Sequence, residues 1–240
     1  MLYAWVLQKV AVLVREVGRP GNAAEYESRA QSLIAAIRTH CFDGEFFTDS
    51  TADVADELSY SQHCQVFAVL CGAAKVEEST RILNESFTND RFSKCSYMMR
   101  FYAFRALALA DDGNLYDSFW DKMWSPWRRM LANNLSTWEE DDVRQRSDCH
   151  AWGSVPIYEY CTELAGVQPI AAGSSKYCSA HDFVALGKDN LAEISWKLYF
   201  DSEKIVELRL HKAVEIISRL PGGKEEEHGI IDYLRLVFKD

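Results

Sequence analysis

The sequence lacks an excess of basic residues. It has 240 residues, with 26 Lys and Arg against 36 Asp and Glu, which gives a net charge of −10. Proteins that bind nucleic acid normally carry a clustered basic face and a high isoelectric point. The sequence therefore predicts no nucleic-acid partner. Hydrophobic residues make up 48% and charged residues 26% of the chain, as in proteins that bury a core, so disorder and a collagen-like structure are excluded.

Long hydrophobic runs are also missing. The longest, Ala4 to Val14, is interrupted by Gln8 and Lys9 and falls short of the roughly 20 residues that cross a bilayer. No membrane span is therefore expected. The first residues lack a basic region and no small-residue cleavage site follows them, so no secretory signal is expected either. These features favour a cytoplasmic location for the chain as given, or a chain that begins inside a longer one.

The cysteines lack the spacing of a disulfide framework or a zinc site. Their number is odd, seven, and none forms a C-x-x-C pair. We expect reduced, mostly buried thiols and no metal site. Two cysteines do follow or precede a histidine, at His63-Cys64 and Cys149-His150. Adjacent residues on a helix point about 100° apart and rarely hold one metal together.

What is present is a series of helical patterns over the first 170 residues. Apolar residues recur at helical intervals, and Gly, Pro and capping-box spacings separate the segments. Pro20-Gly21 is interpreted as a loop, Asn22 and Ser59 as helix starts, and Pro126 as a break or restart. Residues 42–57 are acidic and irregular, which predicts a loop. The expected helices cover residues 1–17, 22–41, 59–72, 76–86, 97–109, 114 onward to beyond Pro126, and 153–164.

About seven helices, joined as antiparallel hairpins and apolar on more than one side, predict a mainly α fold of the layered barrel or toroid type. After Gly187 the period changes to two, as in Ile194, Trp196 and Leu198. Short strands are expected there, the last over residues 230–238. The sequence thus predicts two domains: an (α/α) barrel segment over residues 1–170, and a small antiparallel β-sandwich region over residues 171–240.

The segment richest in chemistry lies between two of the predicted helices. It reads Leu-Ser-Thr-Trp-Glu-Glu-Asp-Asp at 135–142 and Arg-Ser-Asp-Cys-His-Ala-Trp-Gly-Ser at 146–154. An acidic run in a loop is often only solvated surface. Sugar sites, however, need flat apolar rings and carboxylates that accept from hydroxyls, and Trp beside Glu supplies both. A carboxylate against an indole also tends to have a raised pKa, as acid–base catalysis requires.

These runs resemble the closing part of the helical barrel of α-L-rhamnosidases. The resemblance rests on Ser-Thr-Trp-Glu at 136–139, Arg-Ser-Asp-Cys-His-Ala-Trp-Gly at 146–153 and Glu-Leu-Ala-Gly-Val-Gln-Pro at 163–169. Further similar runs are Tyr-Ser-Gln-His at 60–63, Gln-Val-Phe-Ala-Val-Leu at 65–70 and Phe-Tyr-Ala-Phe-Arg-Ala-Leu at 101–107. The tail is similar only through Ile-Ser-Trp at 194–196 and Leu-Pro-Gly at 220–222. The resemblance implies an inverting glycosidase on a six-hairpin (α/α) barrel, acting on terminal α-L-rhamnosyl linkages without a cofactor.

The resemblance also assigns roles to residues. Glu139 maps to the general base that activates water, with Glu140 as the competing assignment. His150 maps to a sugar contact, and its alternative is a capping or core histidine. Trp138 and Trp152 are candidate substrate-binding rings, although packing is favoured for Trp152. Asp148 is interpreted as a helix N-cap rather than a sugar contact.

One element of the family's pattern has no match. Inversion requires a second carboxylic acid about 6.5 to 9.5 Å from the base. The family's acidic motif for it is absent, and only Asp53, Asp56 and Glu57 are loop acids near a helix start. A complete barrel needs about twelve helices, so we expect the second half of a longer protein, without the general acid. The alternatives are a non-catalytic carbohydrate-binding or interaction module on the same scaffold, and a helical scaffold whose acidic loop is only solvated.

Overall fold

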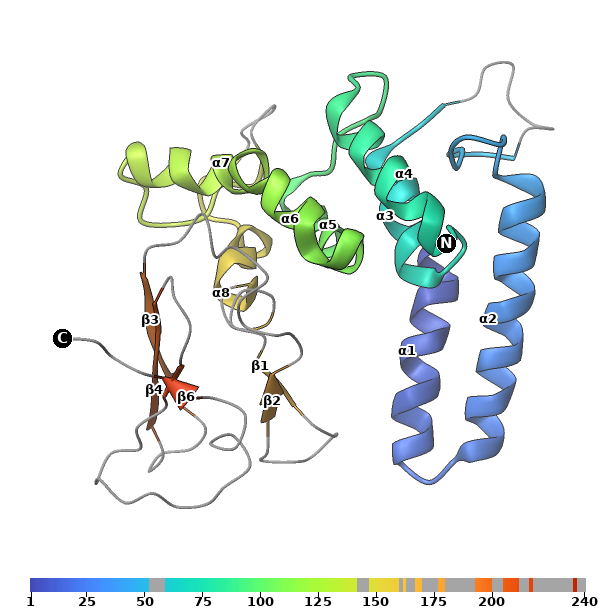
Figure 1. Cartoon of the computed structure of the whole chain (residues 1–240), viewed down its shortest axis with the longest axis horizontal. Helices are drawn as coiled ribbons and strands as arrows, with labels where there is room; N and C mark the ends of the chain where they lie inside the picture. The colour runs from blue at the N-terminus through green and yellow to red at the C-terminus, as the bar shows by residue number, and fades with distance from the viewer. Residues whose placement is uncertain are drawn as a thin grey trace. The chain divides into compact units, whose positions relative to one another are not determined.

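The described residues up to Glu159 are mainly helical, and short antiparallel strand pairs follow them (Figure 1). The computed structural model describes residues 1–51, 59–141, 147–159 and 162, and beyond them the backbone of six strands. The chain divides into two compact units, Met1–Leu115 with Met123–Val155 and Tyr116–Lys122 with Pro156–Asp240.

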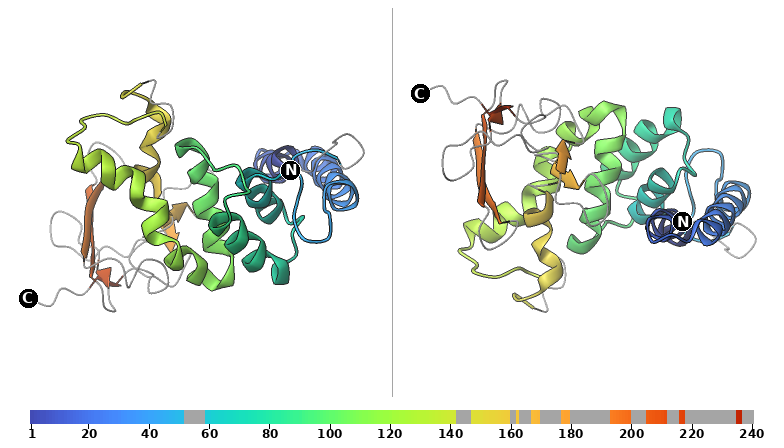
Figure 2. Two further views of the ribbon diagram at one scale, coloured as in Figure 1. Left: turned by 90° about the horizontal axis from the view of Figure 1, so that it is seen from above. Right: turned by 90° about the horizontal axis from the view of Figure 1, so that it is seen from below.

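The first two helices form an antiparallel hairpin. Helix α1 spans Leu2–Glu16 and α2 spans Pro20–His40, and they lie side by side in Figures 1 and 2. Gly18 makes the turn at a φ of 79°, a conformation that favours glycine. The prediction that Pro20 lies in a loop and that the helix starts at Asn22 is wrong. Proline occupies the first turn because its missing N–H would have no partner there anyway.

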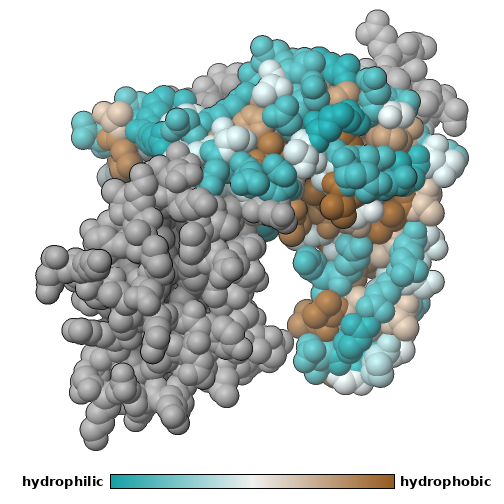
Figure 3. Space-filling model, in the orientation of Figure 1, coloured by the Kyte–Doolittle hydropathy of each residue, from teal (hydrophilic) through white to brown (hydrophobic). Residues whose placement is uncertain are grey.

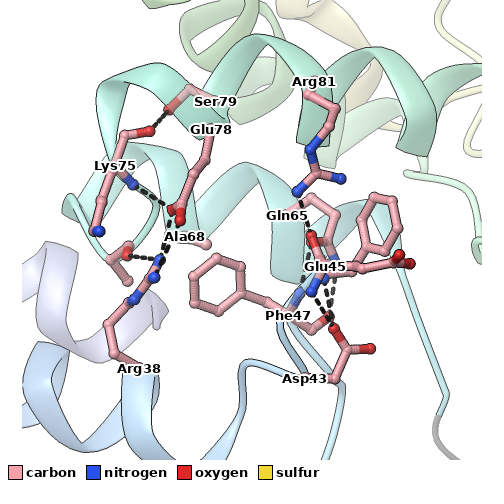
Figure 4. A network of polar contacts seen from close by, with 12 residues as sticks. Arg38, Asp43, Glu45, Phe47, Gln65, Ala68, Lys75, Glu78, Ser79 and Arg81 are labelled. Carbon is pink, nitrogen blue, oxygen red and sulfur yellow. Dashed lines mark hydrogen bonds and ion pairs between the residues drawn. The ribbon is translucent and has the colours of Figure 1, made fainter.

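The second hairpin consists of α3, Gln62–Cys71, and α4, Val76–Thr88. Ser61 caps α3 by accepting a hydrogen bond from the backbone N–H of Cys64 at 3.2 Å, so the start predicted at Ser59 is wrong by two residues. At the start of α4 the Glu78 carboxylate accepts from the backbone N–H of Lys75 at 3.0 Å. It also binds Arg38 of α2, which connects the two hairpins (Figure 4).

The core between these hairpins is aromatic and includes the buried amide of Gln65. Gln65 is fully buried, and its side chain accepts from the N–H of Phe47 at 3.0 Å and donates to the carbonyl of Phe47 at 2.6 Å (Figure 4). The side chains of Phe46 and Phe92 meet with ring centroids 5.1 Å apart. The irregular stretch after α2 is therefore fixed against α3 through its backbone. The buried residues of this core are Ala4, Phe46, Phe47, Ala68, Cys71, Ala73, Ala74, Ile82 and Phe92.

Three helices and a 3₁₀ turn follow. Helix α5 spans Tyr97–Leu109, the turn η1 spans Asp111–Gly113, α6 spans Asn114–Ser118 and α7 spans Trp120–Ala132. The break predicted at Pro126 is wrong, because α7 continues through it. An interior proline costs a helix about 3 kcal/mol. Pro126 is buried together with Trp124 and Trp127, and burial of large apolar side chains contributes about 1.5 to 3 kcal/mol each, which offsets that cost.

The predicted helix 153–164 begins as a 3₁₀ turn, η2, at Ala151–Ser154 and continues as α8 at Val155–Glu159. Residues 160–161 and 163–166 lie outside the described part. The strands then pair antiparallel: β1 (Val167–Pro169) with β2 (Tyr177–Ser179), β3 (Glu193–Tyr199) with β4 (Ile205–His211), and β5 (Ile216–Ile217) with β6 (Arg235–Leu236). Strands β3 to β6 lie where the period-two pattern after Gly187 predicts strands, whereas β1 and β2 were not predicted. The domain boundary after residue 170 lies outside the described residues and stays a prediction.

On the face shown in Figure 3, the described helices are mostly hydrophilic, with hydrophobic areas between. In the part of the chain that the structure describes, no helix combines the length and the apolar character needed to cross a membrane.

Candidate functional site

The two halves of the acidic segment pair with each other. The hydroxyl of Thr137 donates to the carbonyl of Asp148, the N–H of His150 donates to the carbonyl of Trp138 at 2.8 Å, and the N–H of Glu140 donates to the carbonyl of Ser147 at 3.0 Å. We name residues 137–140 and 147–150 the paired arms. Two of the motifs that carry the family resemblance, at 136–139 and 146–153, are thus adjacent in space.

Gly153 allows these arms to lie against the turn that follows them. A Cβ atom added there would lie 2.7 Å from the carbonyl oxygen of Glu139 and 2.8 Å from the Cβ of Trp138, closer than side chains tolerate. Its own carbonyl accepts from the indole N–H of Trp127 on α7 at 2.7 Å. The backbone of the arms therefore has its position fixed against α7.

The carboxylate of Glu139 is buried at the junction of the arms, α5 and α7. Its side chain is 5% exposed, and its Oε2 lies 3.1 Å from the guanidinium of Arg129, whose side chain is 44% exposed. The hydroxyl of buried Tyr97 lies 3.5 Å from the same oxygen and accepts a hydrogen bond from Arg129. Burial lowers the pKa of Arg129, but the hydrogen bonds to Glu139 and Tyr97 outweigh it and raise the pKa overall. The guanidinium stays charged and compensates a carboxylate that would be costly to bury alone.

Aromatic side chains of α5 and α7 pack against one another next to this ion pair. The ring of Trp127 lies 5.9 Å from that of Tyr97 and 6.0 Å from that of Phe104, and Trp124 lies 4.9 Å from Phe104. The contact of Trp127 with Phe104 is stacked and the other two are tilted, and all three have centroid separations in the range of about 4.5 to 7 Å that is typical of aromatic pairs. The residues that hold Glu139 are thus packed into the core rather than carried on a free surface loop.

His150 and Trp152 form a second feature of the site. Their rings stack with centroids 3.8 Å apart and planes 16° apart, and Trp152 remains 44% exposed. The Nδ1 atom of His150 is buried and makes no hydrogen bond within the described residues. Such a nitrogen is costly to leave unsatisfied, by about 1 to 3 kcal/mol.

The structure brings together Glu139, Trp138, His150 and Trp152, the four site residues expected from the sequence, on one pair of arms and the turn after it. Glu140 is buried next to Glu139. The N-cap interpretation of Asp148 is wrong: the N-cap position of η2 is His150, and Asp148 is exposed two residues earlier. Asp53, Asp56 and Glu57 lie outside the described residues.

Sequence reasoning missed the residues that hold Glu139. Arg129 and Trp127 belong to α7 and Tyr97 to α5, 42 residues before the glutamate. One signal in the sequence could have indicated them. Aromatic residues and arginines alternate around Pro126, which is the pattern of a helix with one face in the core and another next to polar groups. Within the described residues, no three His, Cys, Asp or Glu side chains gather as metal ligands would.

Comparison with known proteins gives matches only among solved structures. No family model and no curated protein matches the sequence. The GH78 family rhamnosidase of Bacillus sp. GL1 superposes with a TM-score of 0.75 over 98% of this chain, at 21% sequence identity. The fold is rhamnosidase-like.

A second rhamnosidase, from Klebsiella oxytoca and solved with rhamnose bound, has a TM-score of 0.54 over 65% of this chain at 20% identity. The chain spans 25% of the length of the Bacillus rhamnosidase and 32% of that of the Klebsiella rhamnosidase. The resemblance inferred from the motifs is therefore confirmed for the fold, which is mainly α with helical hairpins. Closure of the helices into a rhamnosidase toroid stays a prediction.

Proposed function

We propose that this chain contributes the general base of a rhamnosidase-type glycoside hydrolase. The reaction would be hydrolysis of terminal α-L-rhamnosyl linkages with inversion, and Glu139 would be the base. The observation that carries this proposal is the buried Glu139 carboxylate, paired with Arg129 and Tyr97 and adjacent in sequence to Trp138, on a rhamnosidase-like fold.

The proposed chemistry uses Glu139 to take a proton from water as the water oxygen bonds to the anomeric carbon of the sugar. The bond from that carbon to the leaving oxygen breaks, and the leaving oxygen takes a proton from a second carboxylic acid. That acid would lie outside the described residues. Arg129 compensates the negative charge of Glu139 in the resting state, and no cofactor enters the reaction.

His150 and the two tryptophans would bind the sugar. The imidazole of His150 is fixed by its stacking on Trp152, and its Nδ1 lacks a partner in the described structure, which suits a polar group whose partner arrives with a ligand. The exposed indole of Trp152 and the half-buried one of Trp138 offer flat apolar surface for the C–H face of a sugar ring. The substrate would be a rhamnose-containing carbohydrate or glycoside.

Turnover of an aryl α-L-rhamnoside tests the base. Glu139→Gln should lower kcat by about 10² to 10⁴-fold and leave rhamnose binding nearly unchanged, because a base acts in the transition state. Glu140→Gln is the matched control, being the adjacent buried glutamate. A larger loss of turnover in Glu140→Gln than in Glu139→Gln would transfer the role to Glu140.

A non-catalytic carbohydrate-binding module is the second candidate. It is favoured by the stacked His150–Trp152 pair, which could bind a sugar ring without any help from Glu139. Rhamnose titrations of the chain, followed by tryptophan fluorescence, distinguish the two. Binding without turnover, and without any effect of Glu139→Gln, would select the module.

A further inference from the structure

Two arginine–glutamate–tyrosine triads occur in the described structure, in opposite environments. In the first, Arg129 binds both Glu139 and the hydroxyl of Tyr97, and the carboxylate is 5% exposed. In the second, Arg29 of α2 binds Glu25 and lies 3.4 Å from the hydroxyl of Tyr3, and this carboxylate is 49% exposed. The second triad is an exposed i,i+4 pair, a class that contributes little to stability.

The first triad, whose carboxylate is buried, also differs because its members come from three separate elements. Tyr97 begins α5, Arg129 lies in the last turn of α7 and Glu139 lies on the paired arms. One terminal nitrogen of Arg129 contacts both the hydroxyl oxygen of Tyr97 and Oε2 of Glu139. The planar guanidinium is suited to such fixed geometry. Relative movement of any of the three elements would change these contacts. The triad therefore restrains the direction of the Glu139 carboxylate.

We propose that Arg129, together with Tyr97, is a positioning residue that fixes the direction of the Glu139 carboxylate for its action on a bound sugar. The role in catalysis rests on the proposed function, whereas the fixed direction of the carboxylate does not. Arg129 would act through Glu139 and would not itself touch the substrate.

Within the described residues, a second arginine near this triad donates a hydrogen bond elsewhere. Arg100 of α5 lies 6.0 Å from the ring centroids of Tyr97 and Trp127, and its guanidinium donates to the carbonyl of Met123 at 2.7 Å. Arg100 is thus directed at the backbone of α7. The indole of Trp127 adds a second restraint, because its bond to Gly153 holds the backbone next to Glu139.

The test compares Arg129→Met, Arg129→Lys and Tyr97→Phe with Arg29→Met, the same change in the exposed triad. In the full chain, Arg129→Met should lower kcat for an aryl α-L-rhamnoside by about 100-fold with KM changed less than about threefold, the size of effect that a displacement near 1 Å produces. Arg129→Lys should recover part of the loss, and Tyr97→Phe should lose about tenfold. Arg29→Met should match the unmodified chain.

The direction of the carboxylate is measured independently, by crystal structures of the same variants. A displaced Glu139 side chain in Arg129→Met supports the proposal even if the unmodified chain neither binds nor hydrolyses rhamnosides, an outcome that would remove the proposed function alone. An undisplaced Glu139 in Arg129→Met, or equal kinetic effects of Arg129→Met and Arg29→Met, overturns the proposal. If Arg129→Met does not fold, the double variant that also carries Glu139→Gln is examined. Recovery of folding in the double variant supports the pairing of Arg129 with Glu139, and no recovery counts against it.

Discussion

At the scale of single residues, Gly153 has a more restricted environment than Gly18, Gly21, Gly44 or Gly72. Gly153→Ala should force the arms away from η2, because its Cβ would meet the Glu139 carbonyl and the Trp138 side chain below 3 Å. We expect a loss of about 1 to 3 kcal/mol in the free energy of unfolding and a loss of rhamnose binding. Urea denaturation measures the first and fluorescence titration the second.

Gly21 provides the control for this substitution. It lies in α2, and a Cβ added there meets nothing within 4 Å. Gly21→Ala should stabilise the chain by up to about 1 kcal/mol, because alanine reduces the conformational freedom of the unfolded state. Equal effects of the two substitutions would contradict the close approach at Gly153.

The described thiols should differ sharply in reactivity. Burial raises the pKa of both Cys64 and Cys95 to about 12, whereas Cys149 is exposed on the paired arms. In a chain with Cys41, Cys161 and Cys178 changed to Ser, Ellman's reagent should label Cys149 rapidly and Cys64, Cys71 and Cys95 far more slowly. A rapid phase that persists after Cys149→Ser would show that one of these three thiols is accessible and would contradict the prediction.

Individual residues could be singled out from the sequence where neighbours carry the pattern. Two short motifs contain Glu139, Trp138, His150 and Trp152, and the roles of these four residues stay a prediction. Arg129 and Tyr97 were not, because they meet Glu139 only through the packing of α5 and α7, and no spacing along the chain encodes that contact. The N-cap assignment of Asp148 failed because the turn at Ala151–Ser154 starts later than the acidic pattern indicates.

At the scale of elements, the buried amide of Gln65 joins α3 to the stretch after α2. Gln65→Leu should leave the N–H and the carbonyl of Phe47 without these partners, at about 1 to 3 kcal/mol for each buried group. The free energy of unfolding should therefore fall by about 2 to 5 kcal/mol in urea denaturation. Gln31→Leu, at an exposed position of α2, should change it by less than about 0.5 kcal/mol. Comparable losses in both variants would show that Gln65 does not join α3 to the stretch after α2.

The elements themselves were largely predictable, and their ends were less so. Helical periodicity located α1 to α5, because their buried faces are continuous in sequence. The predictions for the start of α2 and for the course of α7 were wrong because both depended on how a proline is accommodated. Pro20 fits a first turn, and Pro126 is tolerated within α7 by aromatic burial that the local sequence does not disclose.

At the scale of the whole molecule, two carboxylates link stability to pH. Burial raises the pKa of Asp43, but hydrogen bonds from Tyr60 and the backbone lower it overall, and the hydrogen bond from Arg38 lowers the pKa of Glu78. A group whose pKa is lower in the folded state stabilises it above its unfolded pKa, which is about 4 for these residues. Their contribution should be complete at neutral pH and be lost as the pH falls below about 4.

Thermal unfolding between pH 7 and pH 2 measures this effect. The melting temperature should fall toward acid, and the double change Asp43→Asn with Glu78→Gln should reduce the steepness of that fall. The same double change should lower the melting temperature at pH 7, because charged hydrogen bonds are stronger than neutral ones. An unaltered pH profile in the double variant would exclude these two groups as its source.

The paired arms have a consequence for engineering. Because Thr137, Trp138 and Glu140 are bonded directly to the opposite arm, the described hydrogen bonds hold Glu139 in register with residues 147–150. Engineering could therefore vary the side chains of the two arms while keeping the backbone ladder that sets their register.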